Sequence, residues 1–98
     1  MEKKFFAIKL NPSRPDFAQT MNAEEKAIMQ EHAAYWRGYM SKGKVVVFGP
    51  VLDPNAVYGL GIVCVDEEQE VKEFIAGDPA NKINSYEYYP MLALVPEK

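Results

Sequence analysis

The sequence contains a single cysteine, Cys64, and a single histidine, His32, and both scarcities limit the functions open to the chain. One cysteine excludes an intrachain disulfide and a metal site built from the thiolates of one chain. One histidine with scattered carboxylates is a poor basis for a zinc site, and neither an HExxH pattern nor a phosphate-binding glycine loop is present. We therefore expect no metal and no cofactor.

Long apolar runs and an excess of basic residues are also missing. No run approaches the roughly 20 apolar residues that cross a bilayer. The short apolar run after Lys3 and Lys4 is interrupted by Lys9 and Pro12, too early for a secretion signal. A net charge of −3 offers no basic face to a nucleic-acid backbone. These absences predict a cytoplasmic protein that binds neither nucleic acid nor membrane.

The composition is that of an ordinary globular domain. With 98 residues, 48% of them hydrophobic and 26% charged, we expect one domain spanning residues 1–98. A domain of this size buries only roughly 60–70% of the surface that its unfolded chain exposes. Surplus apolar positions would therefore favour association with another chain.

The spacing of apolar residues predicts six elements in the order strand, helix, strand, strand, helix, strand. Strands are expected at 4–10, 44–48, 58–65 and 86–95, and helices at 23–42 and 67–76. Asn22 with Glu25 forms a capping signature at the start of the first helix, and Gly43 ends it. Asp66 with Gln69 repeats this signature before the second helix.

This order predicts a ferredoxin-like α+β fold, a four-stranded antiparallel sheet with two helices on one face. Strands 4–10 and 44–48 are apolar on both faces, so we expect strand 44–48 to be central in the sheet. Pro90 within strand 86–95 indicates a sheet edge or a bulge. The face without helices would be a large apolar patch, which predicts a homodimer packed sheet to sheet.

His32 falls on the apolar stripe of the first helix, together with Ile28, Tyr35, Trp36 and Tyr39. It should therefore face inward. Two interpretations are open: a core histidine that satisfies a backbone carbonyl, or a general base at a site.

Asp53 follows the turn Gly49-Pro50 and precedes Pro54. One interpretation makes it a residue that stabilises the turn. The other makes it the carboxylate that orients His32, because an aspartate holds the histidine tautomer and stabilises the imidazolium that forms on proton abstraction. The second interpretation predicts a hydrogen bond of roughly 2.6–3.2 Å between the two side chains.

The loop 11–22 is long for a small domain, and such loops are either functional lids or plain connectors. Arg14 is its residue best suited to an anionic group on a substrate. Gly59 and Gly61 clear one face of the third strand, either for a ligand or for a tight strand crossing.

Several motifs follow one another along nearly the whole chain: His32, Gly49-Pro50, Asp53 and Asp78-Pro79. Through them the chain resembles the YciI-like (YCII-related) family. The resemblance implies a small dimeric α+β barrel in which the helix histidine and the aspartate after Gly-Pro form the catalytic pair, roles that fall on His32 and Asp53. Family members often have an arginine where this chain has Met29, and a glycine after the Asp-Pro element where it has residues 81–84.

Together these arguments predict catalytic residues His32 and Asp53, and the following substrate-binding residues: Arg14, Tyr35, Gly49, Pro50 and Asp78. Two functions are left open. The first is a cofactor-independent lyase or isomerase, dehydrochlorinase-like by the resemblance, that acts on a small aromatic or carbonyl metabolite. The second is a homodimer that binds a small molecule, or serves in assembly, without turnover.

Overall fold

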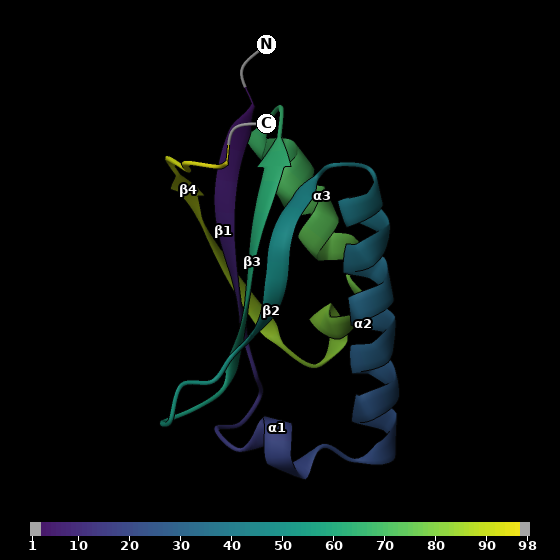
Figure 1. The fold of residues 1–98 in the computed structure, drawn as a ribbon. Helices are drawn as coiled ribbons and strands as arrows, with labels where there is room; N and C mark the ends of the chain where they lie inside the picture. Colours follow the sequence, from purple (N-terminus) through teal and green to yellow (C-terminus); the bar gives the residue numbers. More distant parts are fainter. Residues whose placement is uncertain (1–2, 97–98) are drawn as a thin grey trace.

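A computed structural model describes residues 3–96 as a twisted sheet with helices on one side (Figure 1). The elements follow the predicted order, with a short additional helix before the long one and a 3₁₀ helix before the last strand. Their bounds are β1 Lys4–Asn11, α1 Phe17–Thr20, α2 Ala23–Ser41, β2 Val45–Val51, β3 Tyr58–Val65, α3 Glu68–Gly77, η1 Pro79–Lys82 and β4 Ser85–Met91.

The four strands form one antiparallel sheet in the order β2-β3-β1-β4. Helix α2 connects β1 to β2 across β3, and α3 connects β3 to β4 across β1. Both helices lie on the same side of the sheet (Figure 1). The predicted ferredoxin-like α+β fold is confirmed.

Helix α2 begins and ends where the sequence predicts. The side chain of Asn22 accepts a hydrogen bond from the N–H of Glu25, and the Glu25 carboxylate accepts one from the N–H of Asn22, so both halves of the capping box are present. The helix stops before Gly43, whose φ of 80° lies in the left-handed region that glycine adopts without strain. No helix within residues 3–96 is long and apolar enough to cross a membrane.

Helix α3 begins one residue later than predicted, because a different carboxylate closes its capping box. Glu70 accepts hydrogen bonds from the N–H groups of Asp66 and Glu67, at 2.8 and 3.1 Å. Its other oxygen accepts from the ammonium group of Lys44 at 2.7 Å, which orients the carboxylate. Gln69, the residue predicted for this role, is exposed instead.

Strand β2 lies at an edge of the sheet, so the prediction of a central strand was wrong. Val46 and Val47 are 45% and 56% exposed, and the pairing with β3 shifts register between Val45 and Val47. The prediction assumed that a strand with apolar side chains on both faces has both faces covered by its own chain. Here its outward side chains belong to a sheet face that no element within residues 3–96 covers.

Strand β4 forms the other edge, as the proline within it suggested. Pro90 lies opposite Phe6 of β1. The strand ends at Met91 rather than at Val95, because Met91 already pairs with Phe5, next to the first residue of β1.

The core lies between the sheet and the two long helices. It consists of side chains that are at most 6% exposed, contributed by both layers: Phe6, Ile8, Trp36, Val63, Val71 and Phe74. Burial of this apolar surface fixes α2 against the sheet and so positions the residues on its inner face.

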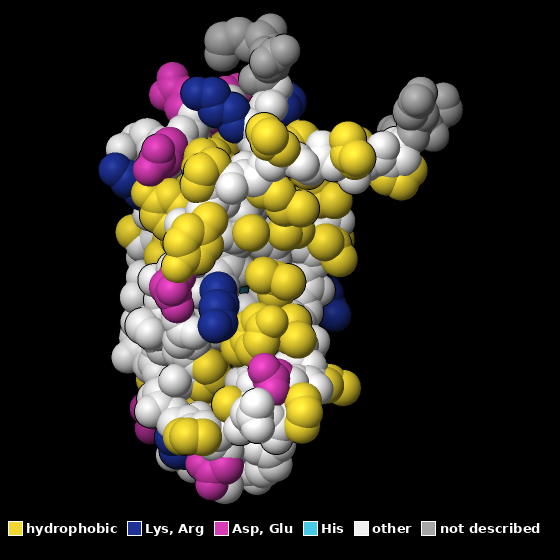
Figure 2. Space-filling model, turned by 90° about the vertical axis from the view of Figure 1, so that its left-hand side faces the viewer, with side chains coloured by type: hydrophobic (Ala, Val, Ile, Leu, Met, Phe, Trp, Pro, Cys, Tyr) yellow, Lys and Arg dark blue, Asp and Glu magenta, His cyan; other side chains and the backbone are white. Residues whose placement is uncertain are grey.

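The opposite face of the sheet is also rich in apolar side chains. Figure 2 shows hydrophobic side chains over much of this face, with few charged groups among them. Val47, Tyr89 and Met91 are exposed there, while Lys9 places its ammonium group 4.7 Å from the ring centroid of Tyr58. Exposed apolar faces of this kind mark surfaces of interaction.

Candidate active site

His32 lies on the face of α2 that is turned toward the sheet, as its place on the apolar stripe predicts. Its side chain is only 13% exposed. Its ring centroid lies 5.7 Å from that of Trp36, one helical turn later. Trp36 is itself buried and packs edge-on against Phe74, with the centroids 4.6 Å apart. The imidazole therefore rests on a rigid part of the core.

The carboxylate that holds His32 comes from Asp78, in the turn between α3 and η1. The Nδ1 atom of His32 lies 2.9 and 3.0 Å from the two oxygens of Asp78. The indole N–H of Trp36 donates to the same carboxylate at 2.7 Å, and the N–H of Ala80 donates at 3.0 Å. Asp78 is thus tied to both α2 and η1, and it is 3% exposed.

This geometry determines the tautomer of the neutral imidazole. An ionised carboxylate only accepts hydrogen bonds, so the proton of neutral His32 lies on Nδ1. The Nε2 atom then has a free lone pair. Among residues 3–96 no group forms a hydrogen bond with Nε2, and His32 contributes to the wall of a cavity.

The Asp78 carboxylate stays ionised at neutral pH despite its burial. Burial alone raises its pKa, but the hydrogen bonds from His32, Trp36 and the Ala80 N–H together hold the pKa of Asp78 below its ordinary value. A negative charge directly behind the ring favours the imidazolium that forms when His32 takes up a proton.

Asp53 is occupied elsewhere. Its Oδ1 accepts a hydrogen bond from the N–H of Asn55 at 2.8 Å, which stabilises its own turn. The hydrogen bond predicted between His32 and Asp53 is not among those formed by the described residues, and Asp78 is the partner of Nδ1 instead. The catalytic role of Asp53 remains a prediction.

Asp78 was assigned to substrate binding, not to the orientation of His32. The sequence contains two aspartates that each precede a proline, Asp53 before Pro54 and Asp78 before Pro79. Both are compatible with a turn. The sequence signal for Asp78 was its position directly after a helix and before Pro79, where an aspartate can cap the next turn, as the bond from the Ala80 N–H shows.

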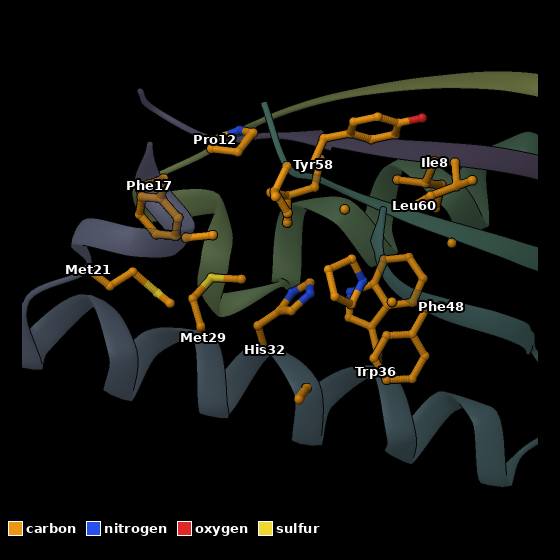
Figure 3. Close-up of a pocket in the computed structure, with 18 residues that line it drawn as sticks. Ile8, Pro12, Phe17, Met21, Met29, His32, Trp36, Phe48, Tyr58 and Leu60 are labelled. Carbon is orange, nitrogen blue, oxygen red and sulfur yellow. The ribbon is translucent and has the colours of Figure 1, made fainter. Parts of the chain in front are cut away.

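An apolar cavity of about 340 Å³ opens beside the imidazole. Figure 3 shows His32 pointing from α2 toward the strands, with Met29 on one side and Trp36 on the other. The predicted substrate-binding residues Gly49 and Pro50 line this cavity. Asp78 does not line it, because it lies behind the ring of His32.

The loop 11–22 forms one end of the cavity. Pro12, Phe17 and Met21 line the wall there, and Figure 3 shows Met21 and Phe17 beside Met29, with Pro12 nearer the strands. Phe17 begins the short helix α1, which was not predicted, and is 4% exposed. The loop therefore contributes to the wall of the same cavity as His32, while a role as a lid remains a prediction.

Arg14, predicted to bind an anionic group of a substrate, forms its hydrogen bonds with other residues of the protein. Its guanidinium group pairs with both carboxylate oxygens of Glu25, at 2.9 and 3.0 Å. It also donates to the side chain and the carbonyl of Thr20. The hydrogen bonds from Arg14 and from the N–H of Asn22 lower the pKa of Glu25 to about 2. Arg14 thus fastens the loop to the start of α2.

Two tyrosines, Tyr35 and Tyr86, lie near the buried carboxylate of Asp78. The Tyr35 hydroxyl donates to the carbonyl of Phe74 at 2.8 Å, so this predicted substrate-binding residue packs in the core. Tyr86, on β4, has a buried hydroxyl for which the described residues provide no hydrogen-bond partner. Burial, followed by the negative charge of Asp78, raises the pKa of Tyr86.

The glycines of β3 serve the packing of the core and also line the cavity. A Cβ atom at position 61 would collide with the indole ring of Trp36, and one at position 59 would lie 3.1 Å from the Cβ of Leu10. Gly59 and Gly61 also belong to the cavity wall. Gly61 therefore provides the space in which Trp36 reaches Asp78.

Within residues 3–96, no three His, Cys, Asp or Glu side chains come together in a way that could hold a metal ion. The chemistry that the described arrangement offers on its own is proton transfer at Nε2 of His32, beside an apolar cavity and backed by an ionised carboxylate.

Known structures share this fold. The match is good to a 5-chloro-2-hydroxyhydroquinone dehydrochlorinase from Burkholderia phenoliruptrix, solved in complex with 2,5-dihydroxybenzoquinone: the TM-score is 0.66 and the identity 22%, over 87% of this chain and 90% of that one. SnoaB, a cofactor-independent oxygenase from Streptomyces nogalater, matches less closely, with a TM-score of 0.48 and 11% identity over 98% and 97% of the two chains.

At 22% identity the first likeness establishes the fold and nothing beyond it. No curated protein matches the chain significantly. A sequence profile of the YCII-related domain matches residues 5–94. The chain therefore belongs to the YCII-related domain family.

Proposed function

We propose that this protein is a cofactor-independent enzyme in which His32 acts as the general base on a small aromatic or carbonyl compound. One observation supports the proposal above all: the Nδ1 of His32 is held at 2.9 Å by a buried carboxylate, while the ring faces an apolar cavity of about 340 Å³. A positioned base next to an apolar cavity is an arrangement suited to proton abstraction.

The proposed step moves one proton. The lone pair of Nε2 takes a proton from a carbon atom next to a carbonyl, and the electrons of the broken C–H bond move through the new C=C bond onto the carbonyl oxygen, giving an enolate. On a hydroxylated ring it takes the proton of a hydroxyl group, and the electrons of the broken O–H bond stay on that oxygen, giving a phenolate. The imidazolium that forms is stabilised by the negative charge of Asp78. Return of the proton to another carbon makes the reaction an isomerisation, and departure of an anion such as chloride makes it an elimination.

A dehydrochlorinase shares the fold, and this suggests that loss of chloride is the elimination to test first. In the proposed mechanism Asp78 positions His32, whereas Asp53, the carboxylate singled out by the sequence, is the alternative orienting group. The cytoplasmic location expected from the sequence is part of the same proposal.

We further propose that the protein is a homodimer that packs the outer faces of its two sheets together. The apolar side chains on that face, including Val47, Tyr89 and Met91, support this arrangement. Sheet-to-sheet packing would remove them from water without disturbing the cavity on the side of the helices.

A small-molecule-binding protein without turnover is the second candidate. It is favoured by the scarcity of polar side chains on the described cavity wall, where His32 and Tyr58 are the only ionisable ones. In that case the bond with Asp78 would only complete the hydrogen bonding of a buried ring.

Proton exchange distinguishes the two candidates. Wild-type protein in D₂O is mixed with a panel of phenols and ketones that are uncharged at neutral pH and of hydroxyquinones that are anionic there, and deuterium on carbon is followed by mass spectrometry. Chloride release from 5-chloro-2-hydroxyhydroquinone is measured in parallel. An enzyme should act on at least one compound, and His32→Ala should lose about 10²–10⁴-fold in rate with an unchanged melting temperature. A His32→Ala protein as active as wild type would exclude His32 as the base.

The orienting carboxylate is identified by a pair of variants. Asp78→Asn removes the charge behind the ring and should lower the rate by about 10²–10⁴-fold, while Asp53→Asn should leave it within about twofold. Circular dichroism shows whether each variant keeps its fold. A large loss in Asp53→Asn with an active Asp78→Asn would reverse the assignment.

A further inference from the structure

The cavity beside His32 also indicates what kind of molecule it binds, an inference that rests on the proposed function. Charged side chains are absent from the described wall, and only three of its side chains have a polar atom: His32, Trp36 and Tyr58. The N–H of Trp36 is already donated to Asp78 at 2.7 Å. His32 is therefore the main polar feature that a ligand would meet.

Cations near the cavity are engaged elsewhere. Arg14, in the loop that closes one end, uses its guanidinium group on Glu25 and Thr20. Lys9 lies over the ring of Tyr58 and does not line the wall. A carboxylate or phosphate on a ligand would thus lose its water without gaining a counter-charge from the described residues, which is strongly unfavourable.

The size of the cavity sets the size of its ligand. Its volume of about 340 Å³ is roughly twice that of the ~150 Å³ apolar cavity that accommodates benzene. Figure 3 shows His32 between two apolar ends, one with Met21 and Met29 and the other with Trp36 and Phe48. Flexible thioethers adapt to varied apolar shapes, and the aromatic end favours flat ones.

We infer that the site accepts an uncharged, largely apolar molecule about the size of two fused rings, with a single acidic or hydrogen-bonding group facing His32. Anionic molecules of the same shape are rejected, because the wall provides no cation. The absence of charged side chains from the described wall then determines which ligands bind, as much as the shape of the cavity does.

Two naphthalenes with the same fused rings, one with a neutral and the other with an anionic substituent at position 2, test this directly. At pH 7, 2-naphthol is neutral and 2-naphthoate is anionic. Affinities are measured by isothermal titration calorimetry, and the NMR signal of the indole N–H reports occupancy of the site, since Trp36 is the chain's single tryptophan. We expect 2-naphthol to bind at least about tenfold more tightly than 2-naphthoate. Equal or tighter binding of the naphthoate, or no shift of the indole signal with either compound, would overturn the inference.

A matched pair of variants tests the cause of the preference. Met29→Arg places a cation on the cavity wall and should reduce the preference for 2-naphthol by at least about tenfold. Gln30→Arg adds the same charge at the neighbouring exposed position, outside the cavity, and should leave both affinities unchanged. If both variants change the preference equally, net charge rather than the wall is responsible, and the inference fails.

Failure of this inference can be told apart from failure of the proposed function. Preferential binding of 2-naphthol without deuterium exchange in any compound of the panel would leave the ligand class standing and refute the enzyme. Exchange confined to anionic compounds would support the enzyme and refute the ligand class.

Discussion

At position 61 the backbone of β3 has room for a hydrogen atom but not for a methyl group, because the indole ring of Trp36 occupies the space. Gly61→Ala should therefore displace the ring and weaken its hydrogen bond with Asp78. Forcing an additional carbon into a packed core costs about 1–3 kcal/mol of unfolding free energy. Urea denaturation measures this loss. Gly49→Ala is the control, since no described atom lies within 4 Å of its added Cβ, and equal stability of the two variants would contradict the argument.

His32 and its two candidate carboxylates show how far the sequence could predict the site. The helical spacing placed His32 inward because the position of a side chain on a helix is a local property. The choice between Asp53 and Asp78 is not local, since each begins an Asp-Pro turn. Asp78 meets His32 across 46 residues of chain, and only the packing of α3 and η1 against α2 brings the two together.

Among the elements, loop 11–22 is held by the pairing of Arg14 with Glu25, whose pKa is lowered to about 2 from an ordinary value of 4.5. Because the folded-state pKa is the lower one, the pairing contributes fully above about pH 4.5 and is lost as the pH falls toward 2. Glu25→Gln imitates the protonated form at neutral pH while keeping a residue that can complete the capping box.

Amide hydrogen exchange tests this attachment. In Glu25→Gln the amides of Phe17, Gln19 and Thr20, which are hydrogen-bonded within the loop, should exchange several-fold faster than in wild type. Glu24→Gln, at an exposed position of the same helical turn, should change nothing. Equal protection in both variants would mean that the packing of Phe17 alone holds the loop.

The strands were located well from the sequence, but their places in the sheet were only partly predicted. Alternation and turn residues bounded β3 correctly, because both are local signals. For β2 the apolar residues on both faces were correct but the central position was not. The sequence of a strand is the same whether its outer face is covered by its own chain or by another molecule.

For the whole molecule, the uncovered sheet face predicts association. Light scattering at micromolar concentration should give twice the 11.1 kDa mass of the chain. Val47→Lys should shift the protein toward monomer, because it places a charge where Val47 is 56% exposed in a single chain. Gln30→Lys makes the same change of charge on the surface of α2 and should stay dimeric. A wild-type monomer would refute the sheet-to-sheet arrangement.

The position of β1 between β3 and β4 has a consequence for synthesis of the chain. Residues 4–11 are synthesised before residues 85–91, their second neighbour in the sheet, with all the other elements of the sheet and both long helices in between. Until β4 has been synthesised, one side of β1 presents unpaired N–H and C=O groups, and exposed strand edges of this kind pair with other chains. A chain terminated prematurely before β4 would retain this open edge next to the core. Truncation of the last strand should therefore lead to aggregation rather than to a smaller folded domain.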